Sequence, residues 1–528
     1  MTTRRNVSKE VGRAAFAAEL KDDPRAKAWT GAGWTISQAD GDFAVLVESG
    51  LDSLPGIDKE LADLARCVMA GEISPLLLEL ESDLPEGLFA LGQVKGLGAK
   101  KVKALWRDLG VTTLGELEYA IQENRLLTLK GFGQKTQQKV AAQLESLRKH
   151  EGMIRRDEAA QIVANVLELA ASASQRVAVA GDYRRGEELT SEVLFVVAAG
   201  EGADAFAEEL DRLRGVRSVT AEAGAFGVAL VEETGSDEHL DALRAKGKLS
   251  GDTEDEVYAG LGLLTTPAER RLAHVPLVLE GAVASPLVQL GDLRGALHNH
   301  TVASDGTATL QEMRQAAAEL GLSYLGITEH SQAAAYARGL SPAALKSQSN
   351  TIVGMNQEGH ACTLLTGVES DILADGALDY PDEQLSELDI VVASVHRRFK
   401  QDPAAMTARM VRAALHPQTA IIGHPTGRLL LARDESGVDI GALIEACLEG
   451  GTALELNANP HRLDLSATHA AMAKEQGVLV SIGADAHSTE GLRNLEHGIA
   501  IARRAGLRPE DVLNTRSLEE LRAWRAEP

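Results

Sequence analysis

The sequence predicts a multidomain α/β protein whose C-terminal half is a parallel β/α barrel, and three observations predict it. First, the chain has 528 residues, which at about 150 residues per domain suggests three to four domains. Second, two glycine-rich turns between helical patterns lie before residue 150. Third, after residue 290 seven apolar, β-rich runs are each followed by a helical pattern such as TLQEMRQAAAELG. That alternation is typical of a parallel sheet.

The composition excludes several classes of protein. Hydrophobic residues make up 44% and charged residues 25% of the chain, which argues against a disordered or fibrous protein. We expect no membrane segment, because no run reaches about 18 apolar residues, and the N-terminal segment does not resemble a signal peptide. Three distant cysteines argue against a disulfide framework and fit a reducing cytoplasm: Cys67, Cys362 and Cys447. The net charge of −24 argues against coating nucleic acid by bulk charge, but a local basic surface remains compatible with it.

The patterns divide the chain into four segments. They are a helical segment over 1–90, a helical segment with two glycine hairpins over 91–150, a mixed strand and helix segment over 155–285, and the strand–helix repeat over 290–528. Eleven of the 14 histidines lie after residue 290, where only three lysines occur. This imbalance indicates a metal site in the last segment and a different task for the front half.

Two glycine hairpins precede amphipathic helices in the second segment. Glycine allows a tight turn and close approach to a ligand, and the free N–H groups of the following helix can face a phosphate. The residues expected to bind DNA are Lys95, Gly96, Gly98, Lys100, Lys101, Lys103, Lys130, Gly131, Gly133 and Lys135. These segments resemble helix-hairpin-helix motifs, although such turns can also simply connect helices. A third copy at Leu54–Asp58 carries an acid that would repel phosphate.

The third segment contains Gly181-Asp182-Tyr183-Arg184-Arg185-Gly186 followed by SEVLFVVAAG, a predicted strand. With the hairpins before it, it resembles the family X DNA polymerases. In that family a glycine-serine pair and paired arginines cradle the nucleotide phosphates, and the next strand carries two metal-binding aspartates one residue apart. Here Glu192 and Leu194 stand at those positions, and a leucine cannot ligate magnesium.

The third aspartate of that family is expected on a strand just before a Thr-Gly-Ser turn. The turn is present as Thr234-Gly235-Ser236, but SVTAEAGAFGVALV before it has no aspartate. The segment is therefore interpreted as a degenerate polymerase palm with vestigial nucleotide-binding residues Arg184 and Arg185. The alternative is an unrelated α/β segment.

Polar residues follow the strands of the fourth segment, and polar residues at strand C-termini indicate an active site on that face of a barrel. The candidate ligands are His298, His300, Asp305, His330, Glu369, His396, His424, Asp485 and His487. His298 and His300 are two apart on a strand and so point to one face. Nine ligands exceed the demand of one ion, so two or three divalent ions are implied. Imidazole with carboxylate suits manganese above all, with zinc or iron as alternatives, and closely spaced ions favour phosphoester hydrolysis.

Residues 290–528 resemble a PHP domain (polymerase and histidinol phosphatase), which implies a distorted (β/α)7 barrel with a trinuclear site. The resemblance implies that the same nine residues are the ligands and form the catalytic site. One departure is Glu329, where the family usually has aspartate, so we expect an effect on orientation more than on metal binding. Arg428 and Arg462 are candidates for phosphate contacts. Arg397, Arg398 and Lys400 could guide a nucleic-acid backbone, or could lie in a solvated loop.

The whole chain resembles the bacterial PolX proteins, in which hairpin and polymerase domains precede a PHP domain. The first interpretation is a DNA repair nuclease, a manganese-dependent 3′→5′ exonuclease or 3′-end phosphoesterase held on gapped or 3′-ended DNA by its front half. The second is an active family X polymerase, and the third a histidinol-phosphate-like small-molecule phosphatase. A DNA-binding module without activity is disfavoured by the nine retained ligands. We expect a monomer in the cytoplasm, associated with the nucleoid.

Overall fold

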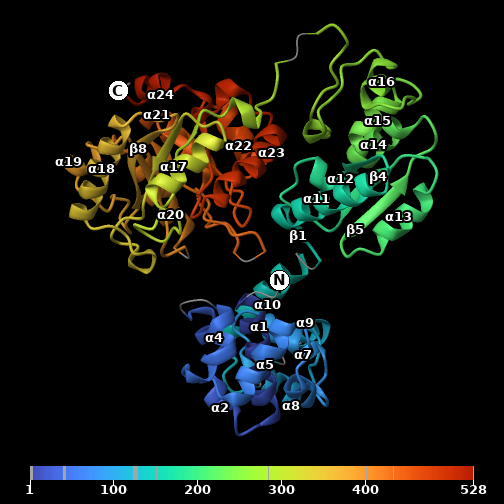
Figure 1. Ribbon diagram of the computed structural model, residues 1–528, viewed down its shortest axis with the longest axis vertical. Helices are drawn as coiled ribbons and strands as arrows, with labels where there is room; N and C mark the ends of the chain where they lie inside the picture. Colours follow the sequence, from blue (N-terminus) through green and yellow to red (C-terminus); the bar gives the residue numbers. More distant parts are fainter. Residues whose placement is uncertain are drawn as a thin grey trace. The chain divides into compact units, whose positions relative to one another are not determined.

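The computed structural model describes residues 4–39, 43–122, 126, 129–149, 152–282, 285–399, 401–431 and 433–526 (Figure 1). The chain forms two compact units, Met1–Glu151 and Gly152–Pro528. Among the residues described, no helix combines the length and the apolar character needed to cross a membrane.

The first unit is helical throughout its described part, as the sequence predicts. Its helices are α1 (Arg4–Lys21), α2 (Ala26–Trp29), α3 (Ala32–Ser37), α4 (Phe43–Ser49), α5 (Lys59–Ala70), α6 (Pro75–Glu81), α7 (Gly87–Gln93), α8 (Ala99–Leu109), α9 (Leu114–Gln122) and α10 (Gln134–Lys149). Buried residues such as Trp29 and Leu61 form one core, among the helices up to α6. A second core, with Leu105 and Phe132, lies among the helices that flank the two hairpins.

The second unit begins with a small α/β segment. Its elements are β1 (Ile154–Arg155), α11 (Arg156–Ser172), β2 (Val177–Ala180), α12 (Gly181–Arg184), β3 (Leu189–Thr190), β4 (Val193–Val197), α13 (Ala203–Asp211), β5 (Val216–Thr220), α14 (Phe226–Thr234), α15 (Asp237–Arg244) and α16 (Glu254–Ala259). Strands β2, β4 and β5 form a sheet in that order, with β2 antiparallel and β5 parallel to β4. Side chains of β4 alternate between two cores: Phe195 packs with α11 and α13, whereas Leu194 packs with α14. We call Gly152–Ala259 the palm-like segment.

The sequence interpretation before Thr234 was wrong in part. Only the start of SVTAEAGAFGVALV belongs to a strand, β5, and the rest forms α14 up to Thr234. Phe226 and Leu230, four residues apart, are buried in one apolar cluster, whereas Val231 is buried in a second cluster with α15 and α16. The turn at Gly235 therefore connects two helices, and the strand expected before it lies one element earlier.

The rest of the second unit is a barrel of seven parallel strands (Figure 1). The strands are β6 (Gly295–Ala296), β7 (Tyr324–Ile327), β8 (Thr363–Asp371), β9 (Ile390–Ser394), β10 (Ile421–Ile422), β11 (Ala453–Asn457) and β12 (Val480–Gly483). They pair in sequence order and always in parallel. A bridge between Asn299 and Ala486, just beyond the first and last strands, nearly closes the barrel.

Helices cover the outside of this barrel, as the alternating pattern predicts. They are α17 (Leu310–Glu319), α18 (Pro342–Gln357), α19 (Asp382–Leu385), α20 (Pro403–Ala414), α21 (Ile440–Gly450), α22 (Ala467–Glu475), α23 (Leu495–Ala505) and α24 (Leu518–Ala526). Residues such as Val391 face these helices, whereas Ile390 and Val392 fill the interior with Tyr324. Because successive strand residues point to opposite sides, the polar residues at the strand ends project over that apolar interior.

Candidate metal centre and nucleic-acid interface

The nine candidate ligands gather at the carboxyl ends of the barrel strands. Glu369 lies within β8, and the other eight lie in the segments that directly follow β6, β7, β9, β10 and β12. Parallel strands end on one face, which is why residues as far apart in sequence as His298 and Asp485 meet. The ligand atoms of three groups lie within 4.8 Å of one another: His300, Asp305, His330 and His487; His298, His300 and Asp485; and His330, Glu369 and His396.

Glu369 lies at the middle of this cluster. Its Oε1 is 3.0 Å from His424 Nε2 and 3.1 Å from His396 Nε2, while its Oε2 is 2.8 Å from His330 Nδ1. The side chain is fully buried. One carboxylate thus faces histidines on both of its oxygens, so it could hold a divalent ion together with these imidazoles.

The charges of the cluster are strongly coupled. Burial alone would raise the pKa of Glu369, but His396 and His298 outweigh it and hold this pKa well below its usual range. Burial opposes the effect of the carboxylates on His330 and His396 as well, yet Glu369 and its neighbours raise the pKa of His330 to about 10 and of His396 to about 9. Burial lowers the pKa of His300 to about 4.

The residues present fit divalent metal ions. Neither ring nitrogen of the buried His300 makes a hydrogen bond of good geometry within the described chain, although its Nε2 is 3.3 Å from Asp485 Oδ1. Buried polar atoms are normally hydrogen-bonded, so a cluster of such nitrogens facing carboxylates is the donor set of a metal site. Imidazole and carboxylate together are suited to manganese, zinc or iron.

Two further carboxylates hold ligands in place, and the sequence reasoning missed both. Glu455 in β11 accepts from His298 Nδ1 at 2.7 Å and from the His424 backbone N–H at 2.7 Å. Asp371 in β8 lies 3.3 Å from His396 Nδ1. Asp371 lies two residues after Glu369 on β8, and Glu455 lies two residues before the polar Asn457 that ends β11. The period of two on a strand could therefore have identified them.

Glu329, the departure noted in the sequence, lies beside the centre rather than in it. Its carboxylate accepts from the backbone N–H of Thr301 at 3.1 Å and from the hydroxyls of Thr301 and Ser304. Gln348 Nε2 donates to it at 2.9 Å. Glu329 therefore fastens the segment that carries His300 and Asp305.

The arginines expected near the substrate have different surroundings. Arg462 Nε lies 3.5 Å from Asp485 Oδ2, and its Nη1 has no hydrogen-bond acceptor within the described chain. Arg428 is buried, and its guanidinium donates to the carbonyls of Arg462 and Leu463. Arg397 and Arg398 are exposed after β9, and Lys400 lies outside the described residues.

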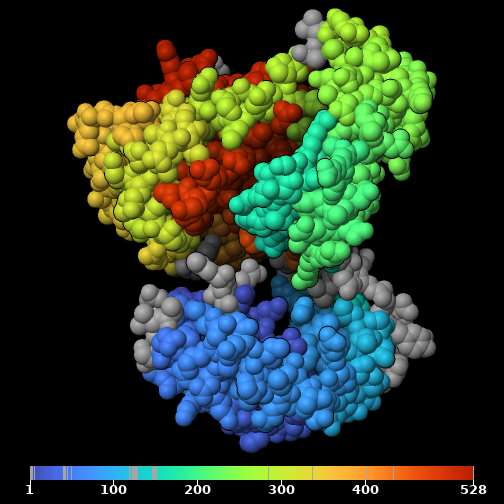
Figure 2. Space-filling view, turned by 45° about the vertical axis from the view of Figure 1, so that its right-hand side comes forward, coloured from blue at the N-terminus to red at the C-terminus, as the bar shows by residue number. Residues whose placement is uncertain are grey.

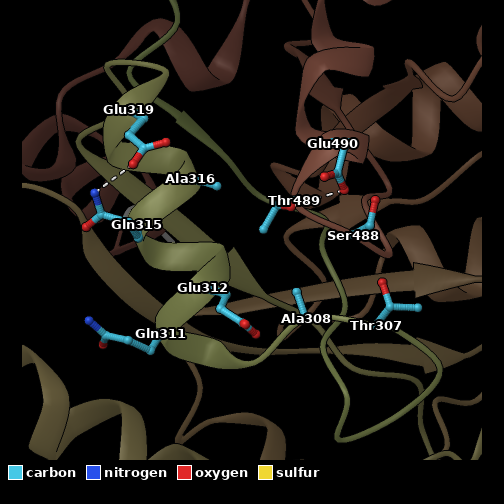
Figure 3. A pocket seen from close by; sticks show the side chains of 10 residues that line it. All are labelled: Thr307, Ala308, Gln311, Glu312, Gln315, Ala316, Glu319, Ser488, Thr489 and Glu490. Atoms are coloured by element: carbon cyan, nitrogen blue, oxygen red, sulfur yellow. Dashed lines mark hydrogen bonds between the residues drawn. The ribbon is translucent and has the colours of Figure 1, made fainter.

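A cavity of about 580 Å³ lies beside the candidate metal centre, between α17 and the residues that follow His487 (Figure 3). Thr307 connects it to the centre, because its backbone N–H and hydroxyl both donate to the His487 carbonyl. Glu312, Glu319 and Glu490 make its lining acidic. That charge disfavours the backbone of a nucleic acid in this cavity.

Both predicted hairpins form tight turns in the first unit. Gly96 has φ 99° and Gly131 has φ 91°, a region that favours glycine. Gly98 caps the N-terminus of α8, and open space surrounds its Cα. Lys95, Lys100, Lys130 and Lys135 are exposed. Backbone N–H groups and lysines thus share one surface at each turn.

Two of the predicted lysines have partners within the first unit. Lys101 Nζ donates to the Gly96 carbonyl at 2.9 Å and so braces the first turn. Lys103 pairs with Asp22, a residue of a distant segment that the local sequence pattern did not include. Lys100 therefore remains the more accessible charge of this helix.

The third hairpin has the same turn but a different helix start. Gly56 has φ 77°, yet Asp58 caps α5 by accepting from the Leu61 N–H at 3.0 Å. Trp29 Nε1 also donates to Asp58 at 2.6 Å. A carboxylate thus takes the place that a phosphate would need, as the sequence reasoning anticipated.

The nucleotide-binding positions of the palm-like segment are engaged by its own carboxylates. Arg184 makes a two-point pair with Glu254 at 2.5 and 2.9 Å, and Arg185 pairs with Asp182. Leu194 packs into an apolar cluster with α14. Glu192 is paired with Arg217 at 3.3 Å, so a cation of the protein lies where the resemblance would place metal.

Comparison with known proteins agrees with this geometry. The family model described as "PHP domain" matches residues 296–459, and the model "SAM-like Helix-hairpin-helix tandem" matches residues 89–146, which include both turns. A probable phosphatase of Thermoanaerobacter sp. (strain X514) is 29% identical over 229 residues, which is 41% of this chain and 89% of that protein.

One relative matches nearly the full length. The protein of Bacillus subtilis (strain 168) named DNA polymerase/3′-5′ exonuclease PolX is 33% identical over 516 residues, 89% of this chain and 90% of that protein. The match to a structure of Leishmania infantum polymerase beta covers 34% of this chain and 96% of the polymerase chain, at 14% identity and a TM-score of 0.22. With a PHP barrel, a hairpin tandem and this similarity over almost its entire length, the chain belongs to the PolX family.

Proposed function

We propose that this protein is a manganese-dependent 3′→5′ exonuclease or 3′-end phosphoesterase that acts in DNA repair. The observation that carries the proposal is the buried cluster around Glu369, in a chain that also presents two hairpin surfaces. Closely spaced divalent ions supply an activated water and a clamp on a phosphoryl oxygen. The relative from B. subtilis is named as a polymerase and 3′-5′ exonuclease, which agrees with DNA as the substrate.

The chain's own residues would divide the work. The nine clustered residues are proposed as ligands, with Glu369 as the bridge between ions. Glu455 and Asp371 hold the rings of His298 and His396 in orientation. Arg462, close to Asp485, is proposed to contact a non-bridging phosphate oxygen. The exposed Arg397 and Arg398 are proposed to guide the DNA backbone, and Arg428 stays a candidate phosphate contact.

Two finer points belong to the same proposal. The ions in the cell are proposed to be manganese, with zinc or iron as alternatives. The protein is proposed to act as a monomer at the nucleoid, with the four segments 1–90, 91–150, 155–285 and 290–528 as its domains. In the first unit, most of the first core comes from residues before 90 and most of the second from residues after it, with Leu20 of α1 packing into the second.

Templated polymerisation is proposed to be absent. The support is the ion pair of Arg217 with Glu192, the apolar packing of Leu194 and the pairing of Arg184 with Glu254. Without fixed carboxylates, magnesium has no defined place between nucleotide and primer end.

A labelled primer–template with manganese, with and without deoxynucleotides, tests the proposal. Shortening of the labelled strand or release of a 3′ phosphate supports it. Extension that depends on nucleotides supports polymerase activity instead. If the protein leaves DNA intact but hydrolyses small phosphomonoesters, the small-molecule phosphatase interpretation, favoured by the similarity of the barrel to probable phosphatases, takes its place.

A further inference from the structure

A buried arginine connects the palm-like segment to the barrel loop that carries Arg462. Arg428 Nη2 lies 2.7 Å from Glu188 Oε1, and Glu188 belongs to the short segment between α12 and β3. The exposed fractions of the two side chains are only 11% and 22%. On its other side Arg428 Nε donates to the Arg462 carbonyl at 3.1 Å, and Nη2 donates to the Leu463 carbonyl. One guanidinium thus joins three distant stretches of sequence.

The loop held in this way, residues 459–465, reaches the metal centre through Arg462. The Arg462 N–H donates to the Asn459 carbonyl at 2.7 Å, and Asp464 accepts from the Gly427 N–H at 2.9 Å. Arg462 Nε then lies 3.5 Å from Asp485 Oδ2. The backbone position of Arg462 therefore decides where its guanidinium stands relative to the centre.

Glu188 is the acid that balances Arg428. Burial lowers the pKa of Arg428, but Glu188 outweighs the burial and raises it above its ordinary value. Asp464 and then Glu435, whose Oε1 is 3.8 Å from Arg428 Nη1, also raise this pKa, but each contributes less than Glu188. A buried cation that loses its partner is costly and seeks another position. Removal of the Glu188 charge should therefore loosen the contact of Arg428 with the loop.

We propose that Glu188 is a positioning residue for phosphodiester hydrolysis, because through Arg428 it fixes the loop that places Arg462 beside Asp485. The inference rests on the proposed function, since it takes Arg462 as the phosphate contact. It gives the palm-like segment a part in the barrel's reaction, although its own nucleotide-binding positions are occupied by ion pairs.

The palm-like segment and the barrel lie side by side in Figure 2, and a second ion pair between them provides a matched control. Glu187 Oε1 lies 2.5 Å from Arg504 Nη2, at the end of α23. Arg504 Nη1 also donates to the Arg185 carbonyl at 3.1 Å. These contacts join the palm-like segment to the barrel but do not involve the 459–465 loop. Loss of the Glu187 pair should thus report on docking alone.

The test uses the full-length protein with manganese and bis(p-nitrophenyl) phosphate, a small diester that does not need the hairpins. The variants are Glu188→Gln, Glu187→Gln, Arg462→Ala and the double variant Glu188→Gln/Arg462→Ala. Glu188→Gln is expected to lower kcat/KM about fivefold, and Glu187→Gln to stay within about twofold of the wild type. The double variant is expected to be no worse than Arg462→Ala, because Glu188 acts only through Arg462. Metal content and thermal melting of each variant are measured alongside.

Several outcomes overturn the inference while leaving the proposed function intact. They are a Glu188→Gln variant with wild-type kcat/KM, an equal loss in Glu187→Gln, a loss that adds to that of Arg462→Ala, or a loss fully explained by missing metal. Glu188→Asp, which keeps the charge, is expected to recover part of the activity. If the wild type does not hydrolyse the diester, or Arg462→Ala does not affect it, the assignment of the barrel's substrate or of Arg462 fails first.

Discussion

At the scale of single residues, the chemistry depends on one carboxylate among histidines. Glu369 lies within 3.1 Å of His396 and His424 through one oxygen and within 2.8 Å of His330 through the other. An ionised carboxylate without partners would be costly in a buried site. Its ionised form is stabilised here by imidazoles, and the same imidazoles, once neutral, are able to ligate a metal ion. The cluster therefore contributes little to the stability of the fold but is well suited to bind cations.

Loss of a single ligand should abolish hydrolysis and leave DNA binding nearly unchanged. His300→Ala and Asp485→Ala each remove a ligand atom that lies within 4.8 Å of its neighbours, so metal or water activation should be lost. The DNA-binding hairpins belong to the other compact unit. Exonuclease assays and filter binding check the two expectations, and full nuclease activity in either variant would refute the barrel assignment.

The orienting carboxylate Glu455 should tune metal affinity without being a ligand. Glu455→Gln keeps the shape but weakens the hold on the His298 ring and the His424 N–H. Loss of such an outer partner typically costs about 10- to 100-fold in metal affinity or activity. The dependence of activity on manganese concentration is measured for this variant. Glu445→Gln, at an exposed position of α21, is the control. An unchanged manganese dependence would show that Glu455 serves only the fold.

At the scale of elements, the same turn occurs three times with different outcomes. Gly56, Gly96 and Gly131 all have positive φ before a helix. In the first copy Asp58 caps the helix, whereas in the second Gly98 leaves the helix start open. A phosphate is bound by free N–H groups at a helix N-terminus. The residue at the cap therefore decides whether such a turn connects helices or binds DNA.

Charge reversal at the first open hairpin should weaken DNA binding. Lys100→Glu with Lys101→Glu removes two cations, so the slope of log affinity against log salt should fall by about two. Hydrolysis of the small diester should stay nearly unchanged. Because Lys101 also braces the turn, Lys100→Glu alone separates charge from structure. The matched control is Lys9→Glu with Lys59→Glu, two exposed lysines of the same unit.

Unchanged affinity and salt slope in the Lys100/Lys101 variant would reduce the hairpins to helix connectors. The small-molecule phosphatase interpretation would then move ahead. An equal effect of the control pair would instead indicate that only the net charge of the unit matters.

The pairing of α15 with α16 should depend on pH. His239 is buried, with Nε2 2.7 Å from the Tyr258 hydroxyl, and burial followed by Arg271 lowers its pKa to about 4. The unfolded chain binds a proton below about pH 6.5 that the folded chain does not. This contribution is therefore complete above pH 6.5 and decreases as the pH falls toward 4, by about 2 kcal/mol at pH 5.

His239→Gln, which can keep the bond to Tyr258 but does not titrate, isolates this contribution. Hydrogen exchange of peptides over 237–259 is compared between wild type and variant at pH 7 and pH 5. The protection of the wild type relative to the variant should decrease on acidification. A difference that is the same at both pH values would contradict the assignment.

At the scale of the whole molecule, the palm-like segment and the barrel differ in what surrounds their polar side chains. The palm-like sheet is intact, but Arg217 pairs with both Glu192 and Glu233, and Arg184 pairs with Glu254. The barrel keeps all nine candidate ligands. The ion pairs of Glu187 and Glu188 connect the palm-like segment to the barrel.

Template-directed extension should therefore stay at background. With Leu194 in an apolar cluster and Arg217 between two acids, bound magnesium would have to displace an ion pair and would still lack ligands. Primer extension is measured with magnesium or manganese and all four nucleotides. The Asp485→Ala variant is used, so that the primer is not degraded during the assay. Steady incorporation of the templated nucleotide would show that the palm alignment is wrong.

Local sequence patterns were enough to predict the strand–helix order of the barrel and the nine clustered residues. Strand–helix alternation sets a parallel barrel, and parallel strands bring their carboxyl ends to one face, so local patterns suffice to place these side chains together. The hairpins could also be predicted from local sequence, because in each the glycine with positive φ and the start of the helix lie within five residues of each other. The segment before Gly235 was predicted as a strand but forms a helix. A short apolar run fits both the helical and the strand periodicity, and its burial is needed to distinguish them.

The partners of several charged residues could not be predicted from local patterns, because they come from distant parts of the chain. Lys103 meets Asp22, Arg428 meets Glu188, and Arg217 meets Glu192 and Glu233. These ion pairs connect residues that packing alone brings within reach. Whether an arginine is a phosphate contact or a brace depends on whether an acid or a carbonyl lies within hydrogen-bonding distance. That distance is fixed by the arrangement of whole segments, which residue types and spacing leave open.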